Sequence, residues 1–220
     1  MKYFWIIITV LSISILPSLG LSETVKISMA QQKKATIIAQ KALADLILLA
    51  QQVDPESLGF EDEKQIRAAK VGVPISDYFV RLDELREYQP GKPAKEMLHA
   101  TGRLIFPLEV DQRARSMAVL SLKQDDWTIE SFGGTNQIQM ITELRNRIAK
   151  SEERSMREFF QVRIPALKLM FVGMERGSEL YLLPLFDMPH YGLKEGKTYP
   201  AEKVLEKLVE AAQKHNGLPT

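Results

Sequence analysis

Three histidines, His99, His190 and His215, are the side chains best suited to acid–base or metal chemistry near neutral pH. None of them stands at the spacing of an HExxH zinc motif. Only His190 has a carboxylate close by in a loop-like sequence, since Asp187 precedes it by three residues and the two could share a metal ion or a proton. Asp, Pro, His, Tyr and Gly together are also typical of a surface loop. We therefore assign no catalytic residue and no metal ligand to these positions.

Nucleophilic catalysis also lacks its usual motifs. The chain has no Cys, which excludes cysteine nucleophiles, thiolate zinc sites and iron–sulfur ligation. GxSxG is absent, and Ser116, Ser121 and Ser131 fall in or beside predicted strands, where we expect them on the solvent face. Neighbouring carboxylates such as Asp125 and Asp126 would point to opposite faces of a strand, and aspartate is common in hairpin turns.

Gly133 and Gly134 stand between a predicted strand and a predicted helix, a position where backbone N–H groups can bind an anion. The nucleotide-binding patterns GxGxxG and GxxxxGK[ST] are both absent. We interpret the glycine pair as a sharp turn, with Asn136 as the helix cap and Gln139 in the capping-box position. No cofactor is expected.

Aromatic and basic side chains are the remaining candidates for a binding surface. Strands favour aromatic residues for packing, so we predict that those in strands belong to the core. The basic residues around 145–157 alternate with glutamates, which indicates a salt-bridged helix face and not a nucleic-acid surface. The aromatic residues are Trp127, Phe132, Phe159, Phe160, Phe171, Tyr181 and Phe186; the basic ones are Arg145, Arg147, Lys150, Arg154 and Arg157.

Residues 1–22 have the order of a secretory signal peptide: Lys2, an apolar stretch over residues 3–16, Pro17 and then small residues. The apolar stretch is shorter than the ~20 residues of a membrane-spanning helix. The alternative is an uncleaved signal anchor that tethers the domain to a membrane. A lipoprotein is excluded because no Cys is available for lipid attachment. We predict an exported protein, located in a periplasm or in the medium.

The charge balance points to no polyanionic partner. The sequence has 29 Lys and Arg against 28 Asp and Glu, and loss of Lys2 with the signal peptide would make the two equal. A net charge near zero gives no general attraction to nucleic acid or anionic lipid. Contact with a membrane is expected only if the N-terminal segment is retained.

Periodicity predicts three long elements of helix, over residues 28–53, 136–148 and 201–214, with apolar side chains at spacings of three and four. A short charged helix is predicted over 62–70 and a helical turn over 94–101. Strands are predicted over 75–85, 104–110, 114–122, 127–132, 159–164, 167–174 and 179–186. Pro107 suggests that 104–110 is an edge strand, since proline cannot donate to a ladder.

These elements predict an α+β fold in which helices alternate with antiparallel meanders. We expect a single exported domain over residues 23–220, with 23–134 and 135–220 as two candidate halves that share one core. Functionally, we expect a non-enzymatic domain that binds another exported or envelope protein. Two alternatives remain: a small-ligand or hydrolytic domain whose site is assembled from distant residues such as Asp187 and His190, and a membrane-tethered chaperone or assembly factor. The oligomeric state is left open.

Overall fold

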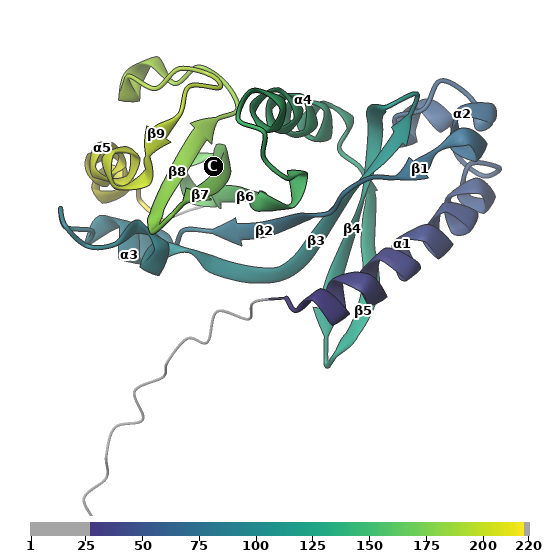
Figure 1. Ribbon diagram of the computed structural model, residues 1–220, viewed down its shortest axis with the longest axis horizontal. Coiled ribbons are helices and arrows are strands. Elements are labelled where there is room, and N and C mark those ends of the chain that lie inside the picture. Colours follow the sequence, from purple (N-terminus) through teal and green to yellow (C-terminus); the bar gives the residue numbers. More distant parts are fainter. Residues whose placement is uncertain (1–26, 218–220) are drawn as a thin grey trace, which may run out of the picture.

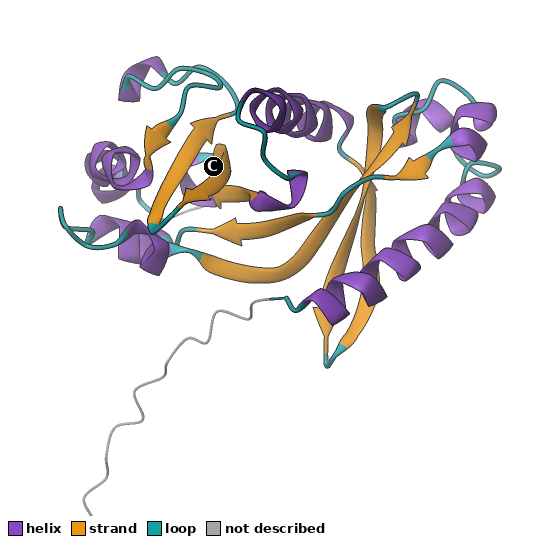
Figure 2. Ribbon diagram, in the orientation of Figure 1, coloured by secondary structure: helices purple, strands orange, loops and turns teal. Residues whose placement is uncertain are grey.

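One mixed sheet runs through the whole described part of the chain. The computed structural model describes residues 27–217, and its nine strands follow the order β5-β4-β3-β2-β6-β7-β8-β9, with β1 beside β3 (Figures 1 and 2). The predicted α+β class is confirmed. The predicted signal peptide lies outside the described residues.

The bounds of the elements are as follows. The strands are β1 (Lys70–Val71), β2 (Ile75–Phe79), β3 (His99–Val110), β4 (Arg113–Lys123), β5 (Asp126–Gly133), β6 (Phe159–Ile164), β7 (Leu169–Arg176), β8 (Glu179–Pro184) and β9 (Tyr199–Pro200). The α-helices are α1 (Met29–Leu49), α2 (Glu63–Ala68), α3 (Leu82–Arg86), α4 (Thr135–Ser151) and α5 (Ala201–Lys214). Short 3-10 helices include η3 (Met156–Glu158) and η5 (Pro189–Tyr191).

The sheet consists of two antiparallel meanders, β2 to β5 and β6 to β9, that meet at a parallel pair. In that pair, Asp77 lies opposite Gln161, and Tyr78 lies opposite Val162. Parallel neighbours need a long crossover connection, which is supplied here by the rest of the first meander and α4. The two candidate halves therefore contribute adjacent parts of one sheet.

Helices cover the two faces of the sheet unequally. On β3, Leu104 and Phe106 pack in the cluster that includes α1, whereas Ile105 packs in the cluster that includes α4. On β6, Val162 packs with α5 and Phe159 with α4. Since successive side chains of a strand point to opposite faces, α1 and α4 lie on opposite sides of β3 and β4, as Figure 1 shows.

Strand β2 establishes that α1 and α5 share one face. Ser76 pairs with Leu104 on the α1 side, and Tyr78 pairs with Val162 on the α5 side. Ser76 and Tyr78 are two residues apart and so point to the same face of the sheet. Helices α1 and α5 therefore cover the two ends of this face. Ser76 and Tyr78 lie between the two helices and are only half-buried. The intervening residue, Asp77, points to the α4 face.

The prediction that residues 104–110 form an edge strand is wrong, because they belong to β3 in the middle of the sheet. Pro107 is tolerated there for a local reason. Its carbonyl accepts a hydrogen bond from the N–H of Gly72 at 2.7 Å, so its backbone faces the gap between β1 and β2. Proline has no backbone N–H, and at this gap no neighbouring strand needs a hydrogen bond from residue 107. The outer strands of the main strand order are β5 and β9, and β1 pairs only with β3.

Several boundaries also differ from the predictions. The strand predicted over 75–85 ends at Phe79 and continues as α3, and the helical turn predicted over 94–101 gives way to β3 at His99. Helix α4 is capped by Gly134 in the left-handed conformation (φ 67°), two residues before the predicted Asn136 cap. In contrast, α5 and β6 have the predicted bounds.

Candidate functional site

Two adjoining hollows lie on the sheet face between α1 and α5. The first, of about 390 Å³, is lined by Ser76, Tyr78, Arg154, Arg157, Glu158, Phe159, Phe160 and Glu175. The second, of about 530 Å³, is lined by Met29, Gln32, Lys33, Thr36, Ile37 and Arg157. Because Arg157 borders both, we treat them as one feature and call it the α1–β6 groove.

The floor of the groove is aromatic. Tyr78 of β2 and Phe160 of β6 meet edge to face, with ring centroids 5.1 Å apart. Both are half-buried and pack against the α5 cluster from one side. Burial, assisted by the carboxylate of Glu175, raises the pKa of Tyr78 above its usual value. The phenol is therefore neutral at physiological pH and offers an apolar ring with a polar edge.

One wall of the groove is the first half of α1. Ser28 begins this helix with a capping box: its hydroxyl accepts from the N–H of Gln31, whose side chain accepts from the N–H of Ser28. The helix then places Met29 and Ile37 on the same side. These two residues are 60% and 54% exposed, and both line the same hollow. The wall thus presents apolar surface that nothing within the described chain covers.

The opposite wall is the segment before β6. Ser155 caps η3 through a second capping box with Glu158, and this turn fixes the backbone of Arg157. Arg154 forms an ion pair with Glu158 (Nη2 to Oε2, 2.5 Å) and donates to the carbonyl of Glu175 at 2.5 Å. The wall is therefore held by local bonds that do not involve the side chain of Arg157.

A buried polar network supports the floor from the α4 side. Asp77 is almost fully buried and accepts hydrogen bonds from Nε and Nη2 of Arg163, at 2.9 and 2.5 Å. The amide of Gln161 and the hydroxyl of Thr101 donate to the same carboxylate, at 2.8 and 3.1 Å. Since both carboxylate oxygens are satisfied, we interpret Asp77 as the link between the two meanders and not as a reacting group.

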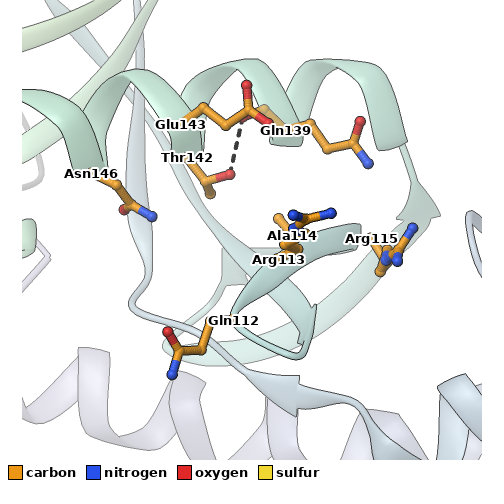
Figure 3. Close-up of a pocket in the computed structure, with 8 residues that line it drawn as sticks. All are labelled: Gln112, Arg113, Ala114, Arg115, Gln139, Thr142, Glu143 and Asn146. Atoms are coloured by element: carbon orange, nitrogen blue, oxygen red, sulfur yellow. Dashed lines mark hydrogen bonds between the residues drawn. The ribbon is translucent and has the colours of Figure 1, made fainter.

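A second, polar cleft of about 420 Å³ lies between the β3–β4 turn and α4 (Figure 3). Its charged side chains have both signs, because α4 contributes Glu143 and β4 contributes Arg113 and Arg115. Arg115 is already paired with Glu61 at 3.1 Å. The cleft is lined by Gln112, Arg113, Ala114, Arg115, Gln139, Thr142, Glu143 and Asn146. Its mixed lining selects no class of ligand.

The structure does not bring Asp187 and His190 into a site. Asp187 accepts from the N–H of Glu195 at 2.8 Å, which closes its own loop, and His190 is exposed on η5. His99 contacts Glu84 at 2.7 Å. His215 is half-buried, and its carbonyl accepts from Arg86. Within residues 27–217, no group of three or more His, Asp and Glu could hold a metal ion.

Two further expectations about polar residues are corrected. Ser116 and Ser121 are buried, not on the solvent face: Ser121 shares a hydrogen bond with Thr128 at 3.2 Å, and Ser116 contacts the carbonyl of Gly133. Arg145 is not part of a solvated helix face. It lies on the buried face of α4, is 2% exposed and donates to the carbonyl of Val73 at 3.0 Å.

Of the seven aromatics predicted for the core, Trp127, Phe159 and Phe171 are buried. Phe132, Phe160 and Tyr181 are half-buried against the core clusters, and the prediction is wrong for Phe186, which is 37% exposed. Phe160 differs from the other aromatics in that it lines the α1–β6 groove. In the sequence, Phe160, Arg154 and Arg157 lie far from Tyr78 and from α1, and no spacing groups them. The sequence does contain one signal for the α1 wall of the groove. Helix α1 carries apolar residues on more than one side, so some of them must lie away from the core.

Comparison with known proteins identifies no relative. No family model, no curated protein and no solved structure matches this chain. Among residues 27–217, no helix has both the length and the apolarity needed to cross a bilayer.

Proposed function

We propose that this protein is an exported binding domain that takes up a polypeptide segment of another exported or envelope protein in the α1–β6 groove. The observation that carries the proposal is the groove itself: an aromatic floor from Tyr78 and Phe160 beside exposed Met29 and Ile37. Apolar surface of this kind, next to polar groups, is typical of sites that bind a partner.

The two hollows suit apolar side chains of a peptide. Each has room for at least one large side chain, at about 390 and 530 Å³. Covering an apolar side chain gains roughly 25 cal/mol per Å² of apolar surface removed from water. Because the floor is fixed by the buried Asp77 network, the site is preformed and loses little conformational entropy when it binds.

A matched pair of substitutions on α1 tests the proposal. Ile37 and Leu48 are similarly exposed, at 54% and 59%, yet only Ile37 lines the groove. Peptides would be selected from a random display library on the purified protein and measured against Ile37→Asp and Leu48→Asp. We expect Ile37→Asp to weaken binding about tenfold or more, and Leu48→Asp to leave it unchanged.

The controls separate this site from other surfaces. Both variants should keep the unfolding midpoint of the natural chain, because both side chains are exposed. If no selected peptide is sensitive to Ile37→Asp, the proposed groove is wrong. Mass spectrometry of the N-terminus of the protein recovered from cells would distinguish a cleaved domain from a tethered chaperone that uses the same groove.

A further inference from the structure

The charges that line the α1–β6 groove are not balanced. Glu158 is paired with Arg154 at 2.5 Å, and Glu175 is paired with Lys95 at 2.9 Å. Lys33 and Arg157 have no ion-pair partner among the described residues, and both are exposed. The acidic groups of the groove are therefore neutralised from within the protein, whereas two cations remain available.

The position of these cations relative to the apolar surfaces is specific. Arg157 borders both hollows, so this residue lies at the boundary between the aromatic floor and the α1 wall. Lys33 lies on the same side of α1 as Met29 and Ile37, one turn from each. A peptide that fills both hollows must pass these two positive charges.

We infer that the segment bound in the groove carries an acidic side chain between two apolar ones, and that Arg157 and Lys33 bind this carboxylate. The inference rests on the proposed function and names the chemistry of its partner. An ion pair open to water contributes little. Once apolar side chains cover the groove, water is excluded and the same pair becomes stronger. An arginine also offers two parallel N–H donors to a carboxylate, which orients the bound segment.

Reciprocal selection tests this inference. A random peptide library would be selected on the natural chain and on the double variant Lys33→Glu with Arg157→Glu. We expect the natural chain to select Asp or Glu flanked by large apolar residues, and the double variant to select Lys or Arg at that position. For an acidic peptide, Arg157→Glu should lower affinity about tenfold or more, and added salt should weaken the natural complex.

Lys34→Glu is the matched control, because Lys34 is the exposed neighbour of Lys33 but does not line the groove. It should leave peptide affinity unchanged. Selected peptides that depend on Ile37 but show no acidic preference would overturn this inference and leave the proposed function standing. If no peptide depends on Ile37, the proposed function itself fails. Peptides that bind only through a free C-terminal carboxylate would also overturn the side-chain assignment.

A membrane surface is the competing occupant, and vesicles provide its test. Phosphatidylglycerol vesicles and neutral phosphatidylcholine vesicles would be sedimented with the protein. If the groove binds an acidic peptide, we expect neither type of vesicle to bind the protein. Binding to the anionic vesicles that Lys33→Glu and Lys34→Glu weaken equally would assign α1 to a lipid surface and overturn the peptide site.

Discussion

The ring of Phe160 lies over the α-carbon of Gly173, its partner residue on β7. A Cβ atom placed on Gly173 would stand 2.4 Å from Cε2 of Phe160, which no real contact allows. Glycine is therefore required at this position by the ring and not by the backbone, since Gly173 has no left-handed conformation. The floor of the α1–β6 groove depends on this cross-strand contact.

Gly173→Ala should displace the ring of Phe160 and deform the groove. We expect a loss of about 1–3 kcal/mol in the free energy of unfolding, together with weaker peptide binding. The double variant Gly173→Ala with Phe160→Leu should recover stability, because the smaller side chain relieves the clash, but should not recover affinity. Denaturant unfolding and peptide titration measure the two effects separately. If Gly173→Ala has the same free energy of unfolding as the natural chain, the close contact between Phe160 and Gly173 is wrong.

Asp77→Ala should lower the free energy of unfolding by about 3 kcal/mol, because it leaves the guanidinium of Arg163 and the amide of Gln161 without their acceptor. The control is Asp83→Ala, which removes an exposed pair with Arg81 and should have little effect. Urea unfolding of both variants provides the comparison. Equal effects would mean that the buried network does not link the two meanders.

The raised pKa of Tyr78 predicts a dependence of stability on alkaline pH. Folding favours the protonated phenol, so the stabilisation is complete below pH 10, the ordinary tyrosine value, and is lost as the pH rises through the higher folded value. Tyr78→Phe should reduce the decline of unfolding free energy above pH 10. Tyr191→Phe, at a half-buried tyrosine outside the groove, serves as the control variant. An identical decline in the natural chain and Tyr78→Phe would contradict the prediction.

Arg145 predicts an effect of the opposite sign. Burial lowers the pKa of its guanidinium to about 10, so folding disfavours the charged form. Its contribution to stability therefore rises as the pH increases above about 10, and the full penalty of burying the charge is present below that pH. Arg145→Met should leave the free energy of unfolding unchanged or raise it, by up to about 3 kcal/mol at pH 7. A clear loss of stability would indicate that the bond to Val73 outweighs the cost of burial.

The sequence by itself determined the local elements of this protein. Residues 201–214 and 159–164 form the predicted helix and strand because their periodicity and end signals are contained within a few neighbours. The strands predicted over 114–122 and 127–132 leave a short connection for the same reason, and Gln124 and Asp125 in it adopt the positive φ of a tight hairpin. The absence of cysteine chemistry also follows from the sequence alone.

The tertiary structure alone decided which residues meet. Asp77 and Arg163 are separated by 86 positions, and the parallel pairing of β2 with β6 that joins them leaves no periodic mark in either strand. Pro107 predicted an edge by a local rule, whereas the gap between β1 and β2 admits it to a central strand. Burial of Arg145 and exposure of Ile37 likewise depend on where α4 and α1 pack. The groove arises from distant segments on one face of the sheet, and the spacing of residues along a chain does not encode such contacts.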